Sequence, residues 1–293
     1  MATTESASPR FAGIEDWPTA DIVEGIIEGQ FAAIAAVRSA RAALARAIDE
    51  AVVRLARGGR LIYAGAGTSG RIAAQDAAEL PPTFAWPYER AVPVMAGGEE
   101  AMIRAAEGAE DNREAAKQAL IDLKTGPNDV VIGLAASGRT PFAIAALDHA
   151  RSVGALAIGI YNNAGGKLGE AADIPILMDT GPEFVAGSTR MKAGTAQKAA
   201  LNCLSTGIMV KLGFVYRGKM VEMRATNEKL QGRAIQMVAD LADAPLDVAE
   251  RTLAEADGTI KLAVVMLVRG VSRTEGEKLL ANANGILRGA LAG

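Results

Sequence analysis

Two stretches of the chain repeat one local pattern, a short apolar run followed by small residues, Ser-Gly-Arg and a helix. The first is Arg60–Arg71 and the second is Asn128–Thr140. In both, the apolar run is nearly continuous, which is typical of a parallel strand covered on its two faces. The repeat therefore predicts a parallel α/β sheet with both turns at the carboxyl ends of strands, where ligands of such sheets bind.

Further apolar runs alternate with helical patterns through the middle of the chain, so we expect a doubly wound, mainly parallel sheet flanked by helices. The strands are expected at Leu61–Ala64, Ala91–Ala96, Asp129–Leu134, Ala155–Tyr161 and Ile174–Met178. Helices are expected around Met102–Ala106, over 112–123, over Phe142–Arg151, after an N-cap at Ser188 or Thr189, and around Met220–Ile235.

The two ends of the chain differ from this middle part. Residues 1–20 are rich in Ser and Thr and predict an extended arm, whereas the apolar spacing from Asp21 to Ala56 predicts long helices. Residues 240–293 contain three short helical runs separated by glycines. The expected organisation is an arm over 1–20, a sheet domain with N-terminal helices over 21–239, and a small three-helix domain over 240–293.

Composition excludes several kinds of function. The 293 residues carry 31 basic and 34 acidic side chains, so the concentrated positive charge that nucleic acids or anionic membranes require is missing. The single cysteine, Cys203, and the single histidine, His149, exclude a disulfide within the chain and a Cys/His zinc site. His149 lies near the end of a helical stretch, where histidine is more typical of a helix end than of a catalytic triad.

The sequence also predicts a soluble, cytoplasmic protein. No apolar run reaches the ~18 residues of a membrane-spanning helix. The first residues, MATTESASPRFAG, lack the basic and then apolar pattern of a signal peptide.

The first turn, Gly65–Gly70, has the composition of a phosphate site. Backbone N–H groups at the start of a helix, together with hydroxyl groups, suit an anion. The turn also spells G-x-G-x-x-G, the dinucleotide fingerprint, but Glu89 precedes the second strand and Glu99 follows it only after two glycines. The hydroxyls and the second Ser-Gly-Arg turn favour a phosphate monoester. The candidate ligands are Gly67, Thr68, Ser69, Gly70, Ser137, Gly138, Arg139 and Thr140.

The residues of these turns are also compatible with a purely structural role. Ser and Thr cap helices without any ligand, and a glycine turn can serve the backbone alone. Arg71 and Arg139 follow the glycines, and each either contacts the anion or pairs with an acidic neighbour.

Two glutamates near the turns are candidates for an acid and a base. Glu79 precedes Pro81 and Pro82, which are expected to stop the first helix, and the negative end of a helix dipole raises the pKa of a buried carboxyl. Glu110 follows Gly108 at the start of a new helix, where ionisation is favoured. Two carboxyls shifted in opposite directions can act as acid and base. Most glutamates near helix ends, however, are solvated surface residues.

Six motifs in fixed order make the pattern specific. They are GAGTSGR, DAAELPPT, EGAED, AASGRTP, GSTRMKAGTAQK and ATNEKL. Together they resemble the motifs of the N-acetylmuramic acid 6-phosphate etherases, bacterial cell-wall recycling enzymes with the sugar isomerase (SIS) fold. The resemblance runs from Thr4-Glu5-Ser6 to Val248–Leu291. The chain departs from the family pattern at Ser8 and Phe11 in the arm, and at Leu80, where the family commonly has cysteine.

The resemblance implies a cofactor-free carbon–oxygen lyase of amino sugar catabolism. Such an enzyme eliminates D-lactate from C3 of N-acetylmuramic acid 6-phosphate and adds water, giving N-acetylglucosamine 6-phosphate. The C1 carbonyl of the opened sugar acidifies the C2 proton, so the reaction needs a base for this proton and an acid for the lactate oxygen. By resemblance the acid falls on Glu79 and the second catalytic carboxylate on Glu110. Ser188 and Lys192 join the substrate-binding candidates, and no metal or nucleotide is required.

Two other functions share these features. A sugar-phosphate isomerase would use the same anchor and move the same C2 proton. A non-catalytic phosphosugar-binding regulator would bind without turnover, as the glucokinase regulatory protein, which resembles these etherases, does. We expect a homodimer, because SIS domains usually pair and Phe31–Ala56 is more apolar than one buried face needs. Lys192 and Asn227–Lys229 are the places where a partner subunit could contribute to the site.

Overall fold

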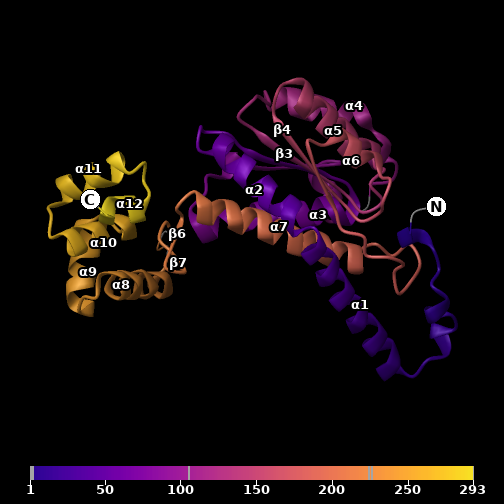
Figure 1. Ribbon diagram of the computed structural model, residues 1–293, viewed down its shortest axis with the longest axis horizontal. Helices are drawn as coiled ribbons and strands as arrows, with labels where there is room; N and C mark the ends of the chain where they lie inside the picture. The colour runs from indigo at the N-terminus through magenta and orange to yellow at the C-terminus, as the bar shows by residue number, and fades with distance from the viewer. Residues whose placement is uncertain (1–2, 105, 224, 226, 293) are drawn as a thin grey trace. The chain divides into compact units, whose positions relative to one another are not determined.

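The computed structural model describes residues 3–104, 106–223, 225 and 227–292 (Figure 1). The chain divides into two compact units. The first contains Met1–Ala78 and Tyr88–Thr206, and the second contains Glu79–Pro87 and Gly207–Gly293. The boundary expected after residue 239 falls inside helix α8 (Glu228–Ala242), because α8 shares one hydrophobic core with the C-terminal helices.

The first unit is built on a five-stranded parallel sheet. Its strands are β1 Leu61–Gly65, β2 Ala91–Met95, β3 Val130–Ala135, β4 Leu156–Tyr161 and β5 Ile174–Leu177. Their order is β2-β1-β3-β4-β5, with every neighbouring pair parallel. Strands β1, β3 and β4 are buried along their whole length, as their continuous apolar sequences predict. The predicted α/β fold is confirmed, and each strand end agrees with the prediction to within one residue.

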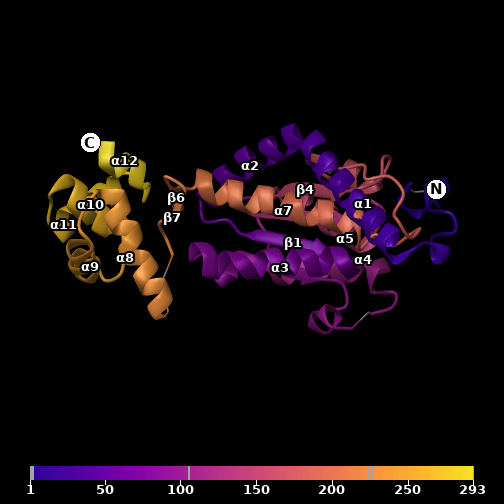
Figure 2. The same cartoon turned by 90° about the horizontal axis from the view of Figure 1, so that it is seen from below.

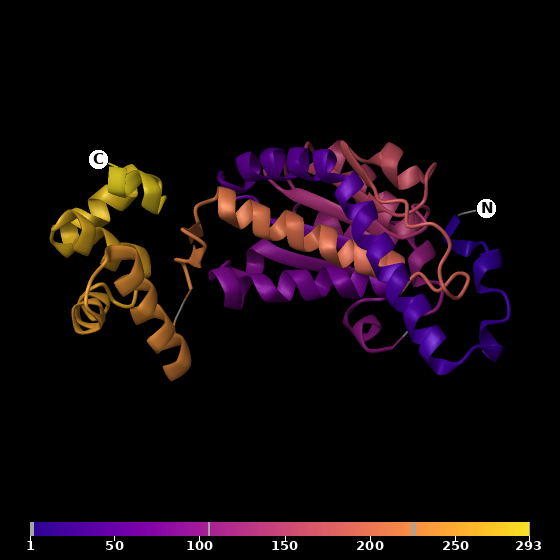
Figure 3. The same cartoon turned by 60° about the horizontal axis from the view of Figure 1, so that its bottom comes forward.

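Helices cover both faces of this sheet. They are α1 Thr19–Ser39, α2 Arg41–Leu55, α3 Gly67–Phe84, α4 Arg113–Asp122, α5 Pro141–Ser152, α6 Lys167–Ala171 and α7 Lys192–Lys211. Helices α4, α5 and α6 share one hydrophobic core with the strands. Helices α2, α3 and α7 lie on the opposite face (Figures 1 and 2), with α7 between the other two (Figure 3). Helix α1 contacts α7, since Thr195 Oγ1 donates a hydrogen bond to Gln30 Oε1 at 2.6 Å.

Helix α3 continues through Pro81 and Pro82, so the expectation that these prolines stop it is wrong. Proline has a backbone φ that fits a helix, and each one removes a single hydrogen bond near the helix end. The buried side chains of Leu80 and Phe84 hold this last part in place. The helix ends at Ala85, which is left-handed (φ +52°) and donates its N–H to the Pro81 carbonyl at 2.9 Å.

The described residues after β2 include two short 3-10 turns, Glu99–Met102 and Ala109–Asp111, and residue 105 between them lies outside the described residues. The helix expected around Met102–Ala106 is therefore wrong. Left-handed glycines at Gly97 and Gly108 bend the backbone on both sides of this segment.

The first residues are not an extended arm but a series of 3-10 turns at Thr3–Glu5, Pro9–Phe11 and Ile14–Asp16. Thr4 is fully buried. Its backbone N–H donates to Asn163 Oδ1 at 3.1 Å, and Asn163 Nδ2 donates to Thr4 Oγ1 at 2.9 Å. These bonds hold the first residues at the carboxyl end of β4.

The second unit packs short helices around a hairpin and a core of its own. Its elements are β6 Val215–Tyr216, β7 Lys219–Met220, α8 Glu228–Ala242, α9 Leu246–Glu255, α10 Ile260–Arg269, α11 Arg273–Asn282 and α12 Leu287–Ala292. Four helices lie within residues 243–292, the part of this segment that the structure describes, where three were expected. The hairpin was not predicted, although Arg217 and Gly218, both with positive φ, form the kind of turn that favours one. Throughout the described residues, no helix is long and apolar enough to cross a membrane.

Candidate active site

The first predicted turn joins β1 to α3 at the carboxyl end of the sheet. Gly67 begins α3 with a left-handed backbone (φ +54°), and Ser69, two residues later, is buried. Gly70 packs directly on the end of β1, since a Cβ added there would lie 2.8 Å from the Gly65 carbonyl oxygen. Any side chain at this position would push helix and strand apart. The first N–H groups of α3 are thus held beside the strand end, as an anion site requires.

The second predicted turn follows β3 and has a similar construction. Gly138 is left-handed (φ +67°), and a Cβ added there would lie 2.9 Å from the Gly166 Cα. Ser137 Oγ accepts the Arg139 N–H at 3.1 Å. Thr140 precedes α5, yet within the described part of the chain its hydroxyl makes no capping hydrogen bond. Capping therefore does not explain the Thr140 hydroxyl.

The two turns lie side by side. Strand β3 pairs in parallel with β1, and Leu134 is opposite Gly65 at the ends of these strands. The predicted meeting of both turns at one edge of the sheet is thus what the structure shows. A small anionic group could contact both at once, because neighbouring strands are only about 4.8 Å apart.

A cavity of about 370 Å³ opens beside the first turn, at the carboxyl ends of β1 and β2. Gly67 and Arg71 line it from α3, and Glu107 and Glu110 line it from the loop that follows β2. Glu110 is exposed and lies in the 3-10 turn just before α4. Of the predicted ligand residues, Gly67 thus shares a cavity with this carboxylate.

Glu79 lies elsewhere on α3. It is exposed, and it is not among the described residues that line the cavity. It is twelve residues after Gly67 on α3, which corresponds to about 18 Å at the rise of an α-helix. This exceeds the length of a six-carbon sugar phosphate.

The segment before α7 differs from the prediction. Ser188 and Thr189 do not cap α7, which begins at Lys192. The carboxylate of Glu183, which is fully buried, accepts the N–H groups of Lys192 at 3.0 Å and Ala193 at 2.9 Å. Sequence reasoning missed this cap because the acid is nine residues away from the helix start. Ser188 is half-buried in the turn between them.

Lys192 is buried, and its ammonium donates to the Thr180 carbonyl at 3.0 Å. Burial lowers the pKa of Lys192, and the negative charges of Glu183 and Asp179 offset part of this effect. A Cβ added at Gly29 of α1 would lie 3.1 Å from the Lys192 Cδ. The side chain thus fills the space between α1 and the segment before α7.

Curated relatives match almost the whole chain. N-acetylmuramic acid 6-phosphate etherase from Deinococcus radiodurans is 46% identical over 288 residues, which covers 98% of this chain and 94% of the relative. Proteins of the same name from Streptomyces coelicolor and Lactobacillus gasseri are also 46% identical, over 99% and 97% of this chain and 93% and 95% of their own lengths. This chain belongs to the N-acetylmuramic acid 6-phosphate etherase family.

The fold comparisons agree with membership of this etherase family. Residues 43–151 match the model for the glucokinase regulatory protein N-terminal SIS domain, and residues 112–207 match the model for the SIS domain. A phosphoheptose isomerase from Francisella tularensis has a TM-score of 0.51 and 20% identity, and the match covers 66% of this chain and 98% of that one. At this identity the likeness concerns the fold alone, and it confirms the SIS type.

A buried carboxyl on α3 was not singled out in the sequence of this etherase-family chain. Asp76 accepts hydrogen bonds from the Tyr63 hydroxyl at 3.0 Å and from Ser205 Oγ at 3.0 Å. Burial raises the pKa of Asp76, although these hydrogen bonds partly oppose the shift. The bonds join α3 to β1 and α7. The sequence signal that could have identified Asp76 is its position on the apolar face of the amphipathic helix α3.

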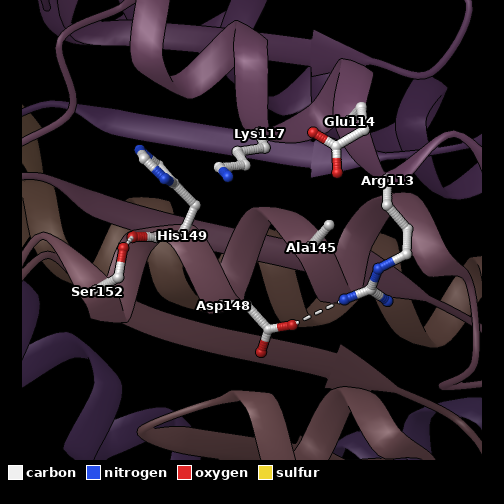
Figure 4. A pocket seen from close by; sticks show the side chains of 7 residues that line it. All are labelled: Arg113, Glu114, Lys117, Ala145, Asp148, His149 and Ser152. Carbon is white, nitrogen blue, oxygen red and sulfur yellow. Dashed lines mark hydrogen bonds and ion pairs between the residues drawn. The ribbon is translucent and has the colours of Figure 1, made fainter.

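A second hollow, of about 300 Å³, lies between α4 and α5, away from the strand ends (Figure 4). His149 lines it in the last turn of α5, as the sequence suggested, and burial together with the positive charge of Lys117 lowers the pKa of His149. Arg113 and Asp148 form an exposed ion pair across it at 3.0 Å. Neither predicted turn and neither predicted glutamate belongs to this hollow. Among the described residues, no cluster of three or more His, Cys, Asp or Glu could hold a metal ion.

Proposed function

We propose that this chain cleaves the D-lactyl ether of N-acetylmuramic acid 6-phosphate and releases N-acetylglucosamine 6-phosphate and D-lactate. The observation that carries the proposal is the match to curated etherases, at 46% identity over nearly the full length of both chains. The cavity between the first turn and Glu110 supports it, since the reaction needs an anion anchor and a carboxylate at one site.

In the proposed site, the phosphate is held by both turns. The ligands are the backbone and hydroxyl groups of Gly67, Thr68, Ser69, Gly70, Ser137, Gly138 and Thr140, with the Arg139 guanidinium as counter-charge. Their support is the side-by-side placement of the two strand ends. A phosphate monoester is recognised by N–H groups at helix N-termini and by hydroxyls without any metal. Ser188 and Lys192 would complete the substrate side, with Lys192 leaving its bond to the Thr180 carbonyl.

Glu110 is the proposed base that takes the C2 proton, because it shares the cavity with the anchor. Removing its carboxylate would stop both proton exchange and elimination. The C2 carbanion expels the C3 ether oxygen, which an acid must protonate as lactate leaves. Water then adds at C3. The carboxylate left by the acid takes a proton from this water, and the protonated base returns a proton to C2.

Glu79 is the proposed acid, supplied by a second subunit. Within one chain it lies about 18 Å along α3 from Gly67, and its side chain is exposed. In a homodimer with two-fold symmetry, α3 of each subunit could lie at the cavity of the other, which gives two equivalent sites. The site would then be complete only in the dimer.

The proposed dimer contact includes an apolar stripe on α1. Val23, Ile27, Phe31 and Ile34 recur at helical spacing, and all four are exposed, Phe31 by 72%. An exposed stripe of this kind marks a protein contact surface. We expect light scattering to give a dimer for the wild type and a monomer for Phe31→Lys. The matched Ala32→Lys change lies on the opposite side of α1 and should leave the dimer intact. A wild-type monomer at micromolar concentration would contradict this part of the proposal.

Isotope labelling tests the chemistry most sharply. In water enriched in oxygen-18 and deuterium, elimination followed by hydration puts one solvent oxygen on C3 and one solvent hydrogen on C2 of the sugar product, and no solvent oxygen on lactate. Hydrolysis by attack on the lactyl carbon would instead label lactate. A sugar-phosphate isomerase would form a ketose and release no lactate.

One observation favours a second candidate, a non-catalytic phosphosugar-binding regulator. Residues 43–151 match the glucokinase regulatory protein domain. This match covers a smaller part of the chain than the etherase matches do. A regulator would gain thermal stability with N-acetylmuramic acid 6-phosphate yet leave the compound unchanged. The expected cytoplasmic location stays a prediction, to be tested by cell fractionation.

A further inference from the structure

The sequence offered two equivalent arginines, one after each Ser-Gly turn, but the structure gives them different surroundings. Arg139 is exposed, and within the described residues its guanidinium has no hydrogen-bond partner. Arg71 is half-buried on α3, one helical turn after Gly67. Its Nε donates to the Met102 carbonyl at 3.1 Å and its Nη2 to the Ala101 carbonyl at 2.9 Å.

Those two carbonyls belong to the end of the 3-10 turn Glu99–Met102. The last carbonyls of a short helix have no partner within it, so an arginine fork is a strong external cap. Arg71 therefore fastens α3 to the loop that leads from β2 to Glu110. Residue 105 of this loop lies outside the described residues.

The loop is folded tightly around one glycine. Gly97 is left-handed (φ +85°), and a Cβ added there would lie 2.6 Å from Ala106 Cβ, 3.1 Å from Ala101 Cβ and 3.4 Å from Ala109 Cβ. The carbonyl of Ala101 accepts a hydrogen bond from Arg71. Ala101 and Ala109, the residue before Glu110, thus both lie next to Gly97.

We propose that Arg71 is a positioning residue that couples the phosphate turn to Glu110. Its guanidinium holds the loop so that the Glu110 carboxylate stays at the cavity beside Gly67. The inference rests on the proposed roles of Glu110 as base and of the first turn as anchor. It assigns Arg71 no direct contact with the phosphate, in contrast to Arg139.

This role has a kinetic signature. Without the fork, the substrate would still bind through the two turns, but the base would be misplaced, and a displacement of about 1 Å can cost on the order of 100-fold in rate. We expect Arg71→Ala to lower kcat by about 10- to 100-fold with KM changed less than about threefold. Exchange of the C2 proton with solvent should fall by the same factor. Lysine cannot form the two-pronged contact, so Arg71→Lys should be only partly active.

Two comparison variants separate positioning from binding and from stability. Arg139→Ala should raise KM and leave kcat nearly unchanged. Arg90 also donates to backbone carbonyls, those of Leu55 and Gly59, but at the amino ends of β1 and β2. Arg90→Ala should lower the melting temperature without changing kcat or KM below that temperature. Added guanidinium should restore part of the activity of Arg71→Ala and leave the activity of Arg90→Ala unchanged.

Amide hydrogen exchange gives a readout that does not depend on turnover. Faster exchange over residues 97–110 is expected in Arg71→Ala and not in Arg90→Ala. An unchanged kcat in Arg71→Ala, or a raised KM with unchanged kcat, would overturn the positioning role. The wild-type lactate assay tests the proposed function separately, whereas the ratio of variant to wild type and the exchange pattern test Arg71.

Discussion

Gly67 and Glu110 line the same cavity at the carboxyl end of the sheet. One begins the helix after β1, and the other ends the loop after β2, so neighbouring parallel strands deliver both to one place. Glu79 lies twelve residues after Gly67 on α3, about 18 Å at the rise of an α-helix. The anchor and the base are thus proposed to come from one subunit and the acid from the other.

Glu110→Gln should abolish the proton transfer that starts the reaction. We expect C2 exchange and D-lactate release to fall together by at least about 100-fold, because a positioned base contributes about 100- to 10,000-fold. Glu107 lines the same cavity and is the matched control. Glu107→Gln should stay within a few-fold of the wild type. Equal losses of D-lactate release in Glu107→Gln and Glu110→Gln would contradict the proposal that Glu110 is the base.

Mixing two inactive variants tests whether Glu79 acts in the partner's site. Glu79→Gln and Glu110→Gln chains are combined, unfolded and refolded together. A mixed dimer then has one site with both carboxyl groups intact, so about a quarter of wild-type activity should return in an equal mixture. If both glutamates act within one chain, the mixture stays inactive. Glu79→Gln alone should lose lactate release and keep C2 exchange.

The hydroxyls of the second turn should affect substrate affinity more than rate. Ser137→Ala and Thr140→Val are each expected to raise KM by about tenfold, since a hydrogen bond to a charged group contributes roughly 1.5 kcal/mol. Binding of N-acetylmuramic acid without its phosphate should be weak and equal in all three proteins. A variant with unchanged KM would place the phosphate outside this turn.

Stability in acid should depend on Asp129, which precedes β3. Burial alone would raise the pKa of Asp129, but hydrogen bonds from Arg60 and from the Gly126 N–H hold it below its usual value. A carboxyl with a lowered pKa stabilises the fold above its unfolded pKa of about 3.9 and loses that contribution as the pH falls through the folded pKa.

We therefore expect Asp129→Asn to lower the free energy of unfolding by about 2 kcal/mol at pH 7. The difference from the wild type should shrink as the pH falls below about 4. Urea unfolding of both proteins at pH 7 and pH 3 measures it. A difference that stays constant between these two pH values would show that the charge of Asp129 is not responsible.

The elements that the sequence located best are those with local signals. Each strand is a continuous apolar run bounded by glycine, proline or polar residues, and both turns carry glycines that the backbone needs, such as Gly70 against Gly65. The strand order then places the turns together without further information. The anchor region could for this reason be predicted from the sequence.

The features that could not be predicted depend on contacts between distant residues. The cap of α7 comes from Glu183, and the loop after β2 is held by Arg71, which is about 30 residues away in sequence. Helix α3 passes two prolines because Leu80 and Phe84 are buried, and burial is not visible in a local pattern.

D-lactate released from N-acetylmuramic acid 6-phosphate tests the central claim most directly. A coupled D-lactate dehydrogenase assay with the purified wild-type protein should give one D-lactate for each sugar phosphate consumed, with N-acetylglucosamine 6-phosphate as the other product. Absence of D-lactate, under conditions where the sugar phosphate still raises the melting temperature, would contradict the lyase and favour a binding protein.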